Sequence, residues 1–412
     1  MASPKFSAAQ THAFNKILSD AVASKTTGAV FFGVTTADGP IYLHTAGTKL
    51  PDDPKSGAID EDTVFWLCSQ TKLITTIAAL QLVDQGKIAF DTPVDTVLPE
   101  LANPVVITAY DEQGRPTATA PAQNKITFGQ LLNHSSGLAY FQEGPPTGEF
   151  SDAYSHADED ASAFVKILKG SLPGVPLKFE PGTDYVYGFS TDFVGFVVER
   201  LSGKSLEQYF QDHIFSPLGI TSASFYLTPP LKNRLLPLAQ RNAESGLVEK
   251  WSRPILFERD PADVRVHLGG VGLYSSQKDY LTVLRHLLQI AAGTAASPLL
   301  SRASVDSMFS PTLPPAGATT LSGLADPNLG LPAGAAQYGR GLWVNIVDIP
   351  GKRRSGSGAW GGWASTSFFV DPKTGVAAVF GMQVAPIIGD STHKKFLSVL
   401  EREVYMALGV AV

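Results

Sequence analysis

The stretch FWLCSQTKLITTIAALQ (residues 65–81) places two candidate nucleophiles where a strand-like run meets a helical pattern. Cys68, the single cysteine of the chain, stands directly before Ser69, and Lys72 follows three residues later. Both a cysteine and a serine can form covalent intermediates when a base lies within hydrogen-bond reach. The rest of the sequence has to show which of the two side chains has such a base.

A helix is predicted to begin at this junction, because apolar residues recur at helical spacing from Leu73 onward. Ser69 stands at its start, and Lys72 projects from the same face of the first turn. A lysine held there can take the serine proton when partial burial keeps its amine neutral, and the helix N-terminus favours an anion that develops at the serine. The pattern S-x-x-K alone is weak evidence, since it also occurs at Ser275 and Ser391.

Length and composition describe a globular protein. Its 412 residues, 44% hydrophobic and 17% charged, suffice for two structural lobes and a buried site. The net charge of −6 and the lack of a large Lys/Arg cluster disfavour a nucleic-acid partner. The first 24 residues lack the apolar core of a signal peptide, and no apolar run of membrane-spanning length follows. We therefore expect a cytoplasmic protein without stable membrane insertion, and one cysteine excludes an internal disulfide.

Strand patterns occur at both ends of the chain. They lie in residues 28–36, 41–47, 364–370 and 376–384. The members of each pair are separated by a turn signal, ADGP or DPKTG, so each pair is expected to form a hairpin. We expect these hairpins to share one antiparallel sheet, flanked by an N-terminal helix over residues 7–22 and a C-terminal helix over residues 394–408.

Helical patterns that end at Gly or Pro dominate the middle of the chain. The sequence therefore predicts an α/β (α+β) architecture with a sheet lobe from residues 1–75 and 305–412 and an inserted, mostly helical lobe from residues 76–304. The two lobes would form one domain, with the chemistry in the cleft between them. Residues 142–162 and 311–341 are expected to be long irregular loops that border this cleft.

Further motifs follow the serine in a fixed order: ITFGQLLNHSSGL, PGTDYVYGFSTDFVGFVVERLSG, GGVGLYSS and WGGWASTSFFVDPKTG. In order and spacing they resemble the serine β-lactamase and penicillin-binding-protein superfamily, in the branch of the family VIII carboxylesterases and the fungal statin-type acyltransferases. The resemblance extends from Gly28 to the C-terminus. It implies a β-lactamase/transpeptidase-like fold and a serine nucleophile.

The resemblance also implies roles for individual residues. Ser69 matches the family's nucleophile and Lys72 the lysine beside it, while the family's tyrosine matches Tyr187 in YVYGFSTD rather than Tyr185. A phenol at Tyr187 could accept the serine proton and return it to the leaving alcohol. Cys68 has no base placed for it by any motif, so we interpret it as a small apolar residue.

The family's third motif has two candidates in this chain. Lys-Thr-Gly occurs at residues 373–375, but inside DPKTG it favours a turn between strands. The counterpart is instead WGGW (residues 360–363), in which Gly361 and Gly362 would let the backbone approach the acyl group. The backbone N–H groups of Ser69 and Trp363 would then form the oxyanion hole, and loss of one such donor typically costs about 3 kcal/mol of transition-state stabilisation.

Two departures from the β-lactamase pattern concern the substrate. Trp360 replaces the lysine that would pair with a β-lactam carboxylate, and Phe189 replaces the asparagine two residues beyond the family tyrosine. Both changes make the predicted cleft less polar, so it favours an uncharged acyl ester or thioester.

The sequence therefore predicts a serine-dependent ester hydrolase or acyltransferase that forms an acyl-enzyme. Its substrate would be a small, relatively apolar acyl ester or thioester, and its acceptor water or an alcohol. The resemblance suggests a role in secondary metabolism. The alternatives are a β-lactamase or D-amino-acid peptidase and, in another class, a non-catalytic binding or assembly protein. No cofactor is expected. The eight histidines include no H-E-x-x-H and no close pair, so no metal is expected either. His134 and His267 are interpreted as structural hydrogen-bonding residues near the cleft.

Overall fold

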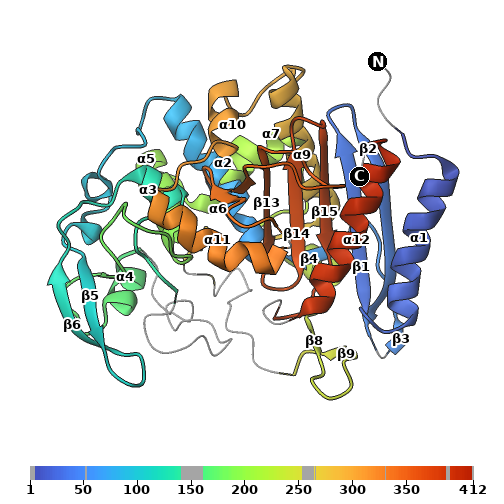
Figure 1. The fold of residues 1–412 in the computed structure, drawn as a ribbon, viewed down its shortest axis with the longest axis horizontal. Coiled ribbons are helices and arrows are strands. Elements are labelled where there is room, and N and C mark those ends of the chain that lie inside the picture. The colour runs from blue at the N-terminus through green and yellow to red at the C-terminus, as the bar shows by residue number, and fades with distance from the viewer. Residues whose placement is uncertain are drawn as a thin grey trace.

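The computed structural model describes residues 5–51, 53–140, 161–252, 264, 266–329, 331–386 and 390–410. Within these residues the central feature is an antiparallel sheet of eight strands in the order β11-β12-β13-β14-β15-β1-β2-β3 (Figure 1). The strands are β1 (Ala29–Thr36), β2 (Pro40–Leu50), β3 (Asp53–Ala58), β11 (Ala336–Tyr338), β12 (Trp343–Asn345), β13 (Ser357–Gly362), β14 (Thr366–Asp371) and β15 (Val376–Gly381). The prediction that both ends of the chain share one sheet is confirmed, since β1 pairs with β15.

The remaining elements are mainly helices. The helices are α1 (Ala8–Ala23), α2 (Thr71–Asp84), α3 (Phe128–Leu132), α4 (Ala161–Lys169), α5 (Ser190–Ser202), α6 (Leu206–Phe210), α7 (Ser216–Leu218), α8 (Pro229–Arg234), α9 (Gln277–Ala292), α10 (Arg302–Met308), α11 (Pro315–Leu329) and α12 (Ser391–Ala407). The short strands outside the large sheet are β4 (Val64–Trp66), β5 (Val105–Tyr110), β6 (Pro116–Pro121), β7 (Pro176–Leu177), β8 (Ala239–Arg241), β9 (Val248–Lys250) and β10 (Tyr274–Ser276). No helix in the described part of the chain is long and apolar enough to cross a membrane.

Helices cover both faces of the large sheet. All of β1 is buried, and its alternating side chains enter two different clusters. Phe32 packs in one cluster with Phe14 of α1 and Leu400 of α12, and Figure 1 shows these two helices beside the sheet. Phe31 points into the other cluster with Leu281 of α9. The sheet is thus the middle layer of the structure.

α2, the helix that follows the candidate nucleophiles, is the most enclosed helix of the second cluster. It packs against α5, α6 and α10, and all of its residues are buried except the last two. Its apolar sequence is therefore explained by burial on every side rather than on one face. Side chains on its first turn are held in fixed positions by this packing. The predicted lobe boundaries near residues 75 and 305 stay a prediction.

One expectation about loops is wrong. Residues 311–341 were expected to be irregular, yet they contain α11 and β11. Pro315 marks the helix start rather than a loop, because it occupies the first turn, where no intrahelical N–H bond is lost. Leu321 of this helix is buried in the α1/α12 cluster, which favours the helix despite its glycines. Of the other expected loop, residues 142–160 lie outside the described residues, and α4 begins at Ala161.

A buried ion pair attaches α12 to the segment before β13. Glu401 accepts hydrogen bonds from Arg353 at 2.8 and 3.0 Å, and their side chains are only 3% and 10% exposed. We expect Glu401→Gln to lower the free energy of unfolding by about 3–5 kcal/mol, because it leaves a buried guanidinium without its counter-charge. Asp348→Asn is the matched control, since its pair with Arg354 is exposed and such pairs contribute about 1 kcal/mol or less. Urea denaturation measures both, and equal losses would contradict this prediction.

Candidate active site

Ser69 lies at a sharp turn between β4 and α2. After β4 ends at Trp66, Cys68 adopts a left-handed backbone with φ of 48°. This conformation costs a non-glycine residue about 1–2 kcal/mol, so surrounding contacts must hold it. Cys68 is indeed only 1% exposed. A 3₁₀ turn over Cys68–Gln70 leads directly into α2, which places Ser69 at the N-terminal end of that helix.

The structure brings Ser69, Lys72 and Tyr187 together. Tyr187 Oη donates a hydrogen bond to Ser69 Oγ at 2.7 Å, and Lys72 Nζ donates to the same oxygen at 3.3 Å. Lys72 Nζ also lies 4.7 Å from the centroid of the Tyr187 ring. Ser69 and Lys72 are both buried. The serine oxygen therefore has as neighbours a phenol and an amine, the two groups that can accept its proton.

Three groups that sequence reasoning missed hold Lys72 in place. Lys72 Nζ donates to Tyr140 Oη and to the Gly270 carbonyl, each at 2.8 Å. The Gly270 N–H in turn donates to Oδ1 of the buried Asp192 at 2.8 Å. Gly270 belongs to the quoted motif GGVGLYSS, but its contact with Lys72 is made by the backbone carbonyl, which does not depend on the residue type. Tyr140 stands two residues after the motif that ends in HSSGL, and this position next to a family motif could have identified it as a site residue.

The end of β13 passes against the turn that carries Ser69. A Cβ at Gly362 would lie 2.4 Å from the Leu67 carbonyl oxygen and 3.1 Å from Cys68 Cβ, so this approach requires a glycine. Trp363 follows Gly362 directly, and its backbone N–H is therefore at the strand end beside this turn. A pair of backbone donors from Ser69 and Trp363 needs such an approach, and their role as an oxyanion hole stays a prediction.

Comparison with known proteins assigns the chain to a family. The family model described as Beta-lactamase matches residues 14–396. The chain belongs to this family. The lovastatin esterase of Penicillium rubens is 31% identical over 389 residues, which cover 89% of this chain and 91% of that protein. The monacolin J acid methylbutanoyltransferase of Aspergillus terreus is 32% identical over 336 residues, which cover 79% of this chain and 78% of that protein.

Solved structures confirm the predicted β-lactamase-like fold. Unliganded simvastatin synthase from Aspergillus terreus matches with a TM-score of 0.80 and 27% identity, over 97% of this chain and 98% of that chain. EstCE1, a hydrolase with promiscuous acyltransferase activity, has the same fold at a TM-score of 0.72 and 21% identity, over 97% and 98% of the two chains. These matches also agree with the branch of esterases and acyltransferases that the motifs indicated.

Two sequence features that competed with this β-lactamase-family site are structural. The Lys-Thr-Gly run at residues 373–375 is part of the turn between β14 and β15, where the Gly375 N–H donates to the Asp371 carbonyl at 2.8 Å. This confirms its interpretation as a turn. Cys68 is buried in an apolar cluster with Val64 and Trp66, which agrees with its interpretation as a small apolar residue.

The other two S-x-x-K patterns are also structural. Ser275 lies in β10, and the lysine three residues later, Lys278, forms a partly exposed ion pair with Asp62 at 3.2 Å. Ser391 is the exposed first residue of α12. In the S-x-x-K pattern at Ser69, by contrast, the serine oxygen accepts a hydrogen bond from a tyrosine hydroxyl.

Aromatic rings surround the candidate catalytic groups. The Trp360 ring lies 5.0 Å from the Tyr187 ring and 5.5 Å from the Tyr338 ring, measured between centroids. Phe189 is buried and meets Tyr140 edge-on at 4.8 Å. The two residues that depart from the β-lactamase pattern therefore place apolar rings against tyrosines of the site.

The two histidines singled out in the sequence have structural contacts. His267 bonds to Tyr226 Oη at 2.9 Å and to Glu199 Oε1 at 3.2 Å, as expected for a structural hydrogen-bonding residue. His134 instead packs its ring 5.0 Å from that of Tyr187, and its Nδ1 has no hydrogen-bond partner among the described residues. Burial lowers the pKa of His134 well below its usual range, so its ring is neutral. Within the described ranges no cluster of three His, Cys, Asp or Glu side chains could hold a metal ion.

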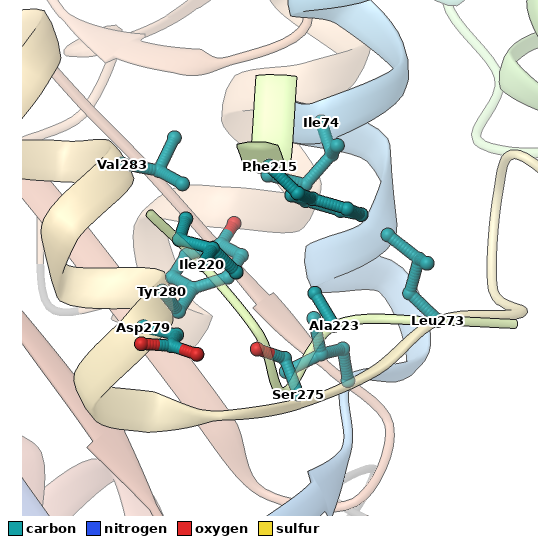
Figure 2. Close-up of a pocket in the computed structure, with 10 residues that line it drawn as sticks. Ile74, Phe215, Ile220, Ala223, Leu273, Ser275, Asp279, Tyr280 and Val283 are labelled. Carbon is teal, nitrogen blue, oxygen red and sulfur yellow. The ribbon is translucent and has the colours of Figure 1, made fainter. Parts of the chain in front are cut away.

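A separate pocket lies next to α2 and α9 (Figure 2). Its lining is mainly apolar and consists of Leu67, Ile74, Phe215, Ile220, Ala223, Leu273, Ser275, Asp279, Tyr280 and Val283. Ser69, Lys72 and Tyr187 are not among these residues. We therefore assign this pocket no part in the chemistry.

The close approach at Gly362 can be tested. We expect Gly362→Ala to lower kcat/KM by about 100-fold or more, because the added methyl group displaces β13 and with it the Trp363 N–H. The matched control is Gly323→Ala in α11, where the added Cβ meets no atom within 4 Å. Steady-state ester hydrolysis measures the effect, with melting temperatures recorded for both variants. Equal kcat/KM values for the two variants would contradict the predicted oxyanion hole.

Proposed function

We propose that the chain is a serine-dependent ester hydrolase or acyltransferase that forms an acyl-enzyme at Ser69. The observation that carries this proposal is the pair of hydrogen bonds to Ser69 Oγ. Tyr187 Oη donates one at 2.7 Å, and Lys72 Nζ donates the other at 3.3 Å. A serine hydroxyl is a weak nucleophile unless a neighbouring base accepts its proton. The site supplies that base inside a buried, aromatic surrounding.

The acylation step uses these groups in order. Acylation starts from a Tyr187 phenolate beside a Lys72 ammonium. As Ser69 Oγ attacks the acyl carbonyl, its proton moves to the phenolate oxygen of Tyr187, and the carbonyl oxygen becomes an oxyanion that accepts hydrogen bonds from the N–H groups of Ser69 and Trp363. The ammonium of Lys72 stabilises negative charge on the Tyr187 oxygen. When the tetrahedral intermediate collapses, Tyr187 returns the proton to the departing alcohol or thiol, and the acyl group stays on Ser69.

The second step reverses the first with a new acceptor. Water or an alcohol gives its proton to Tyr187, attacks the acyl carbonyl and releases Ser69, which recovers the proton. Hydrolysis and acyl transfer differ only in this acceptor, and the relatives include both an esterase and a methylbutanoyltransferase. Trp360 and Phe189 support a small, relatively apolar acyl group, because neither side chain supplies the positive charge that would pair with the carboxylate of an anionic lactam or peptide. The names of the relatives also support a role in secondary metabolism.

An assay of the purified chain with p-nitrophenyl butyrate, with and without an acceptor alcohol, tests this function. We expect release of p-nitrophenol in both cases and a new butyrate ester in the presence of alcohol, while nitrocefin is opened much more slowly. Nitrocefin turnover equal to ester turnover would favour a β-lactamase. The absence of turnover on every acyl substrate would favour a non-catalytic protein with this fold.

A further inference from the structure

Tyr140 contacts the candidate catalytic lysine more closely than the serine does. Among the described residues Lys72 Nζ has three oxygen partners: the Gly270 carbonyl and Tyr140 Oη, each at 2.8 Å, and Ser69 Oγ at 3.3 Å. Lys72 is 1% exposed, so bulk water does not compete for its hydrogen bonds. These three partners therefore determine where its protons and its lone pair point.

The number of protons on the Lys72 amine limits which of its partners can receive a hydrogen bond and which can face a lone pair. A charged Lys72 donates three protons, one to each partner. A neutral amine has two protons and one lone pair, and the Gly270 carbonyl can only accept, so one proton points there. The lone pair must then face either Tyr140 or Ser69. The Tyr140 hydroxyl can donate to it, and it is the nearer of the two.

The surroundings fix this arrangement. The Gly270 peptide is held by Asp192 Oδ1, which accepts its N–H at 2.8 Å. The Tyr140 ring meets the Tyr187 ring edge-on at 5.1 Å and the Phe189 ring edge-on at 4.8 Å. The positions of the Gly270 carbonyl and of Tyr140 are thus each fixed by contacts with other residues. A charged Lys72 has no lone pair, and a neutral Lys72 that accepts a hydrogen bond from the nearer Tyr140 hydroxyl has its lone pair directed away from the serine.

We infer that Tyr140 is a positioning residue that keeps Lys72 as a proton donor toward Ser69, so that Tyr187 accepts the serine proton. This inference rests on the proposed function and assigns the two candidate bases different tasks. Tyr187 moves the proton, since its oxygen lies 2.7 Å from Ser69 Oγ. Lys72 supplies a fixed positive charge beside the phenol, and without the Tyr140 hydroxyl it could turn its lone pair to the serine.

A double-mutant cycle of Tyr140 and Tyr187 tests this assignment. We expect Tyr140→Phe alone to lower kcat/KM for p-nitrophenyl butyrate by about 10- to 100-fold, as expected for loss of a hydrogen bond to a charged group. In a Tyr187→Phe background Lys72 is the remaining base. There we expect Tyr140→Phe to lower the residual kcat/KM by no more than about 3-fold, because the freed lone pair can serve Ser69. Melting temperatures should stay unchanged.

The outcomes separate positioning from a structural role. Equal losses in the two backgrounds, a loss confined to KM, or no loss in the single variant would each overturn the inference. Tyr110→Phe is the matched control, because Tyr110 is 46% exposed on β5 and the same hydroxyl is deleted. Activity that survives Ser69→Ala would refute the proposed function itself. If Ser69→Ala is inactive and Tyr140→Phe is neutral, only the assignment of Tyr140 fails.

Discussion

Ser69→Ala is expected to lower kcat/KM for ester substrates by about 10⁴-fold or more while the protein stays folded. The substitution removes the atom that forms the acyl-enzyme, and no other described serine has a tyrosine and a lysine on its oxygen. The melting temperature should change little, because a small side chain at the N-terminal end of α2 is replaced by one of similar size. Steady-state kinetics with p-nitrophenyl butyrate and thermal melts measure both quantities.

Cys68→Ala is the control for this prediction. Cys68 is adjacent to Ser69 and is also buried, but its side chain packs in an apolar cluster. We expect this variant to keep kcat/KM within about 3-fold and to lose about 1 kcal/mol of stability through lost packing. If Cys68→Ala were inactive and Ser69→Ala active, the cysteine would be the nucleophile and the proposed mechanism would be wrong.

Tyr187→Phe is expected to lower kcat/KM by about 10²- to 10⁴-fold, the usual contribution of a general base. The ring would remain against Trp360 and His134, so only the hydroxyl that donates to Ser69 Oγ at 2.7 Å is lost. Steady-state kinetics with p-nitrophenyl butyrate measure this loss.

Tyr185→Phe provides the matched control. Tyr185 is buried, and its ring lies 6.2 Å from that of His134 and 5.8 Å from that of Tyr338, in the same aromatic layer. The same hydroxyl is removed there, but within the described residues it forms no hydrogen bond to Ser69 or Lys72. We expect its kcat/KM to stay within about 3-fold of the parent value. A larger loss for Tyr185→Phe than for Tyr187→Phe would show that the family tyrosine had been matched to the wrong residue.

The parts of the fold and site that follow from the sequence are those with a local pattern. Alternating strands around ADGP and DPKTG predicted the hairpins that join the two ends of the chain. Ser69 and Lys72 share a helical turn, so their proximity follows from spacing alone. Tyr187 has no such relation to Ser69, which is 118 residues away, and it was found through the resemblance of YGFSTD to a family motif.

The parts that could not be predicted depend on tertiary contacts of the backbone. The Gly270 carbonyl contacts Lys72 across 198 residues, and any residue type carries a carbonyl. The left-handed conformation of Cys68 could not be predicted from the sequence either, because the residue type that usually indicates such a conformation is glycine. Proline and glycine in residues 311–341 favoured a loop, whereas burial of Leu321 in the α1/α12 cluster favours a helix.

The most direct test of the mechanism is the mass of the intact protein during turnover. The purified chain would be mixed with excess p-nitrophenyl butyrate, quenched in acid and analysed by mass spectrometry, followed by peptide mapping. We expect a species heavier by one butyryl group, with the group on the peptide that contains Ser69 and absent from the Ser69→Ala variant. An unmodified mass during rapid turnover would leave the acyl-enzyme unsupported, and a butyryl group on Cys68 or another residue would contradict the assignment of Ser69 as the nucleophile.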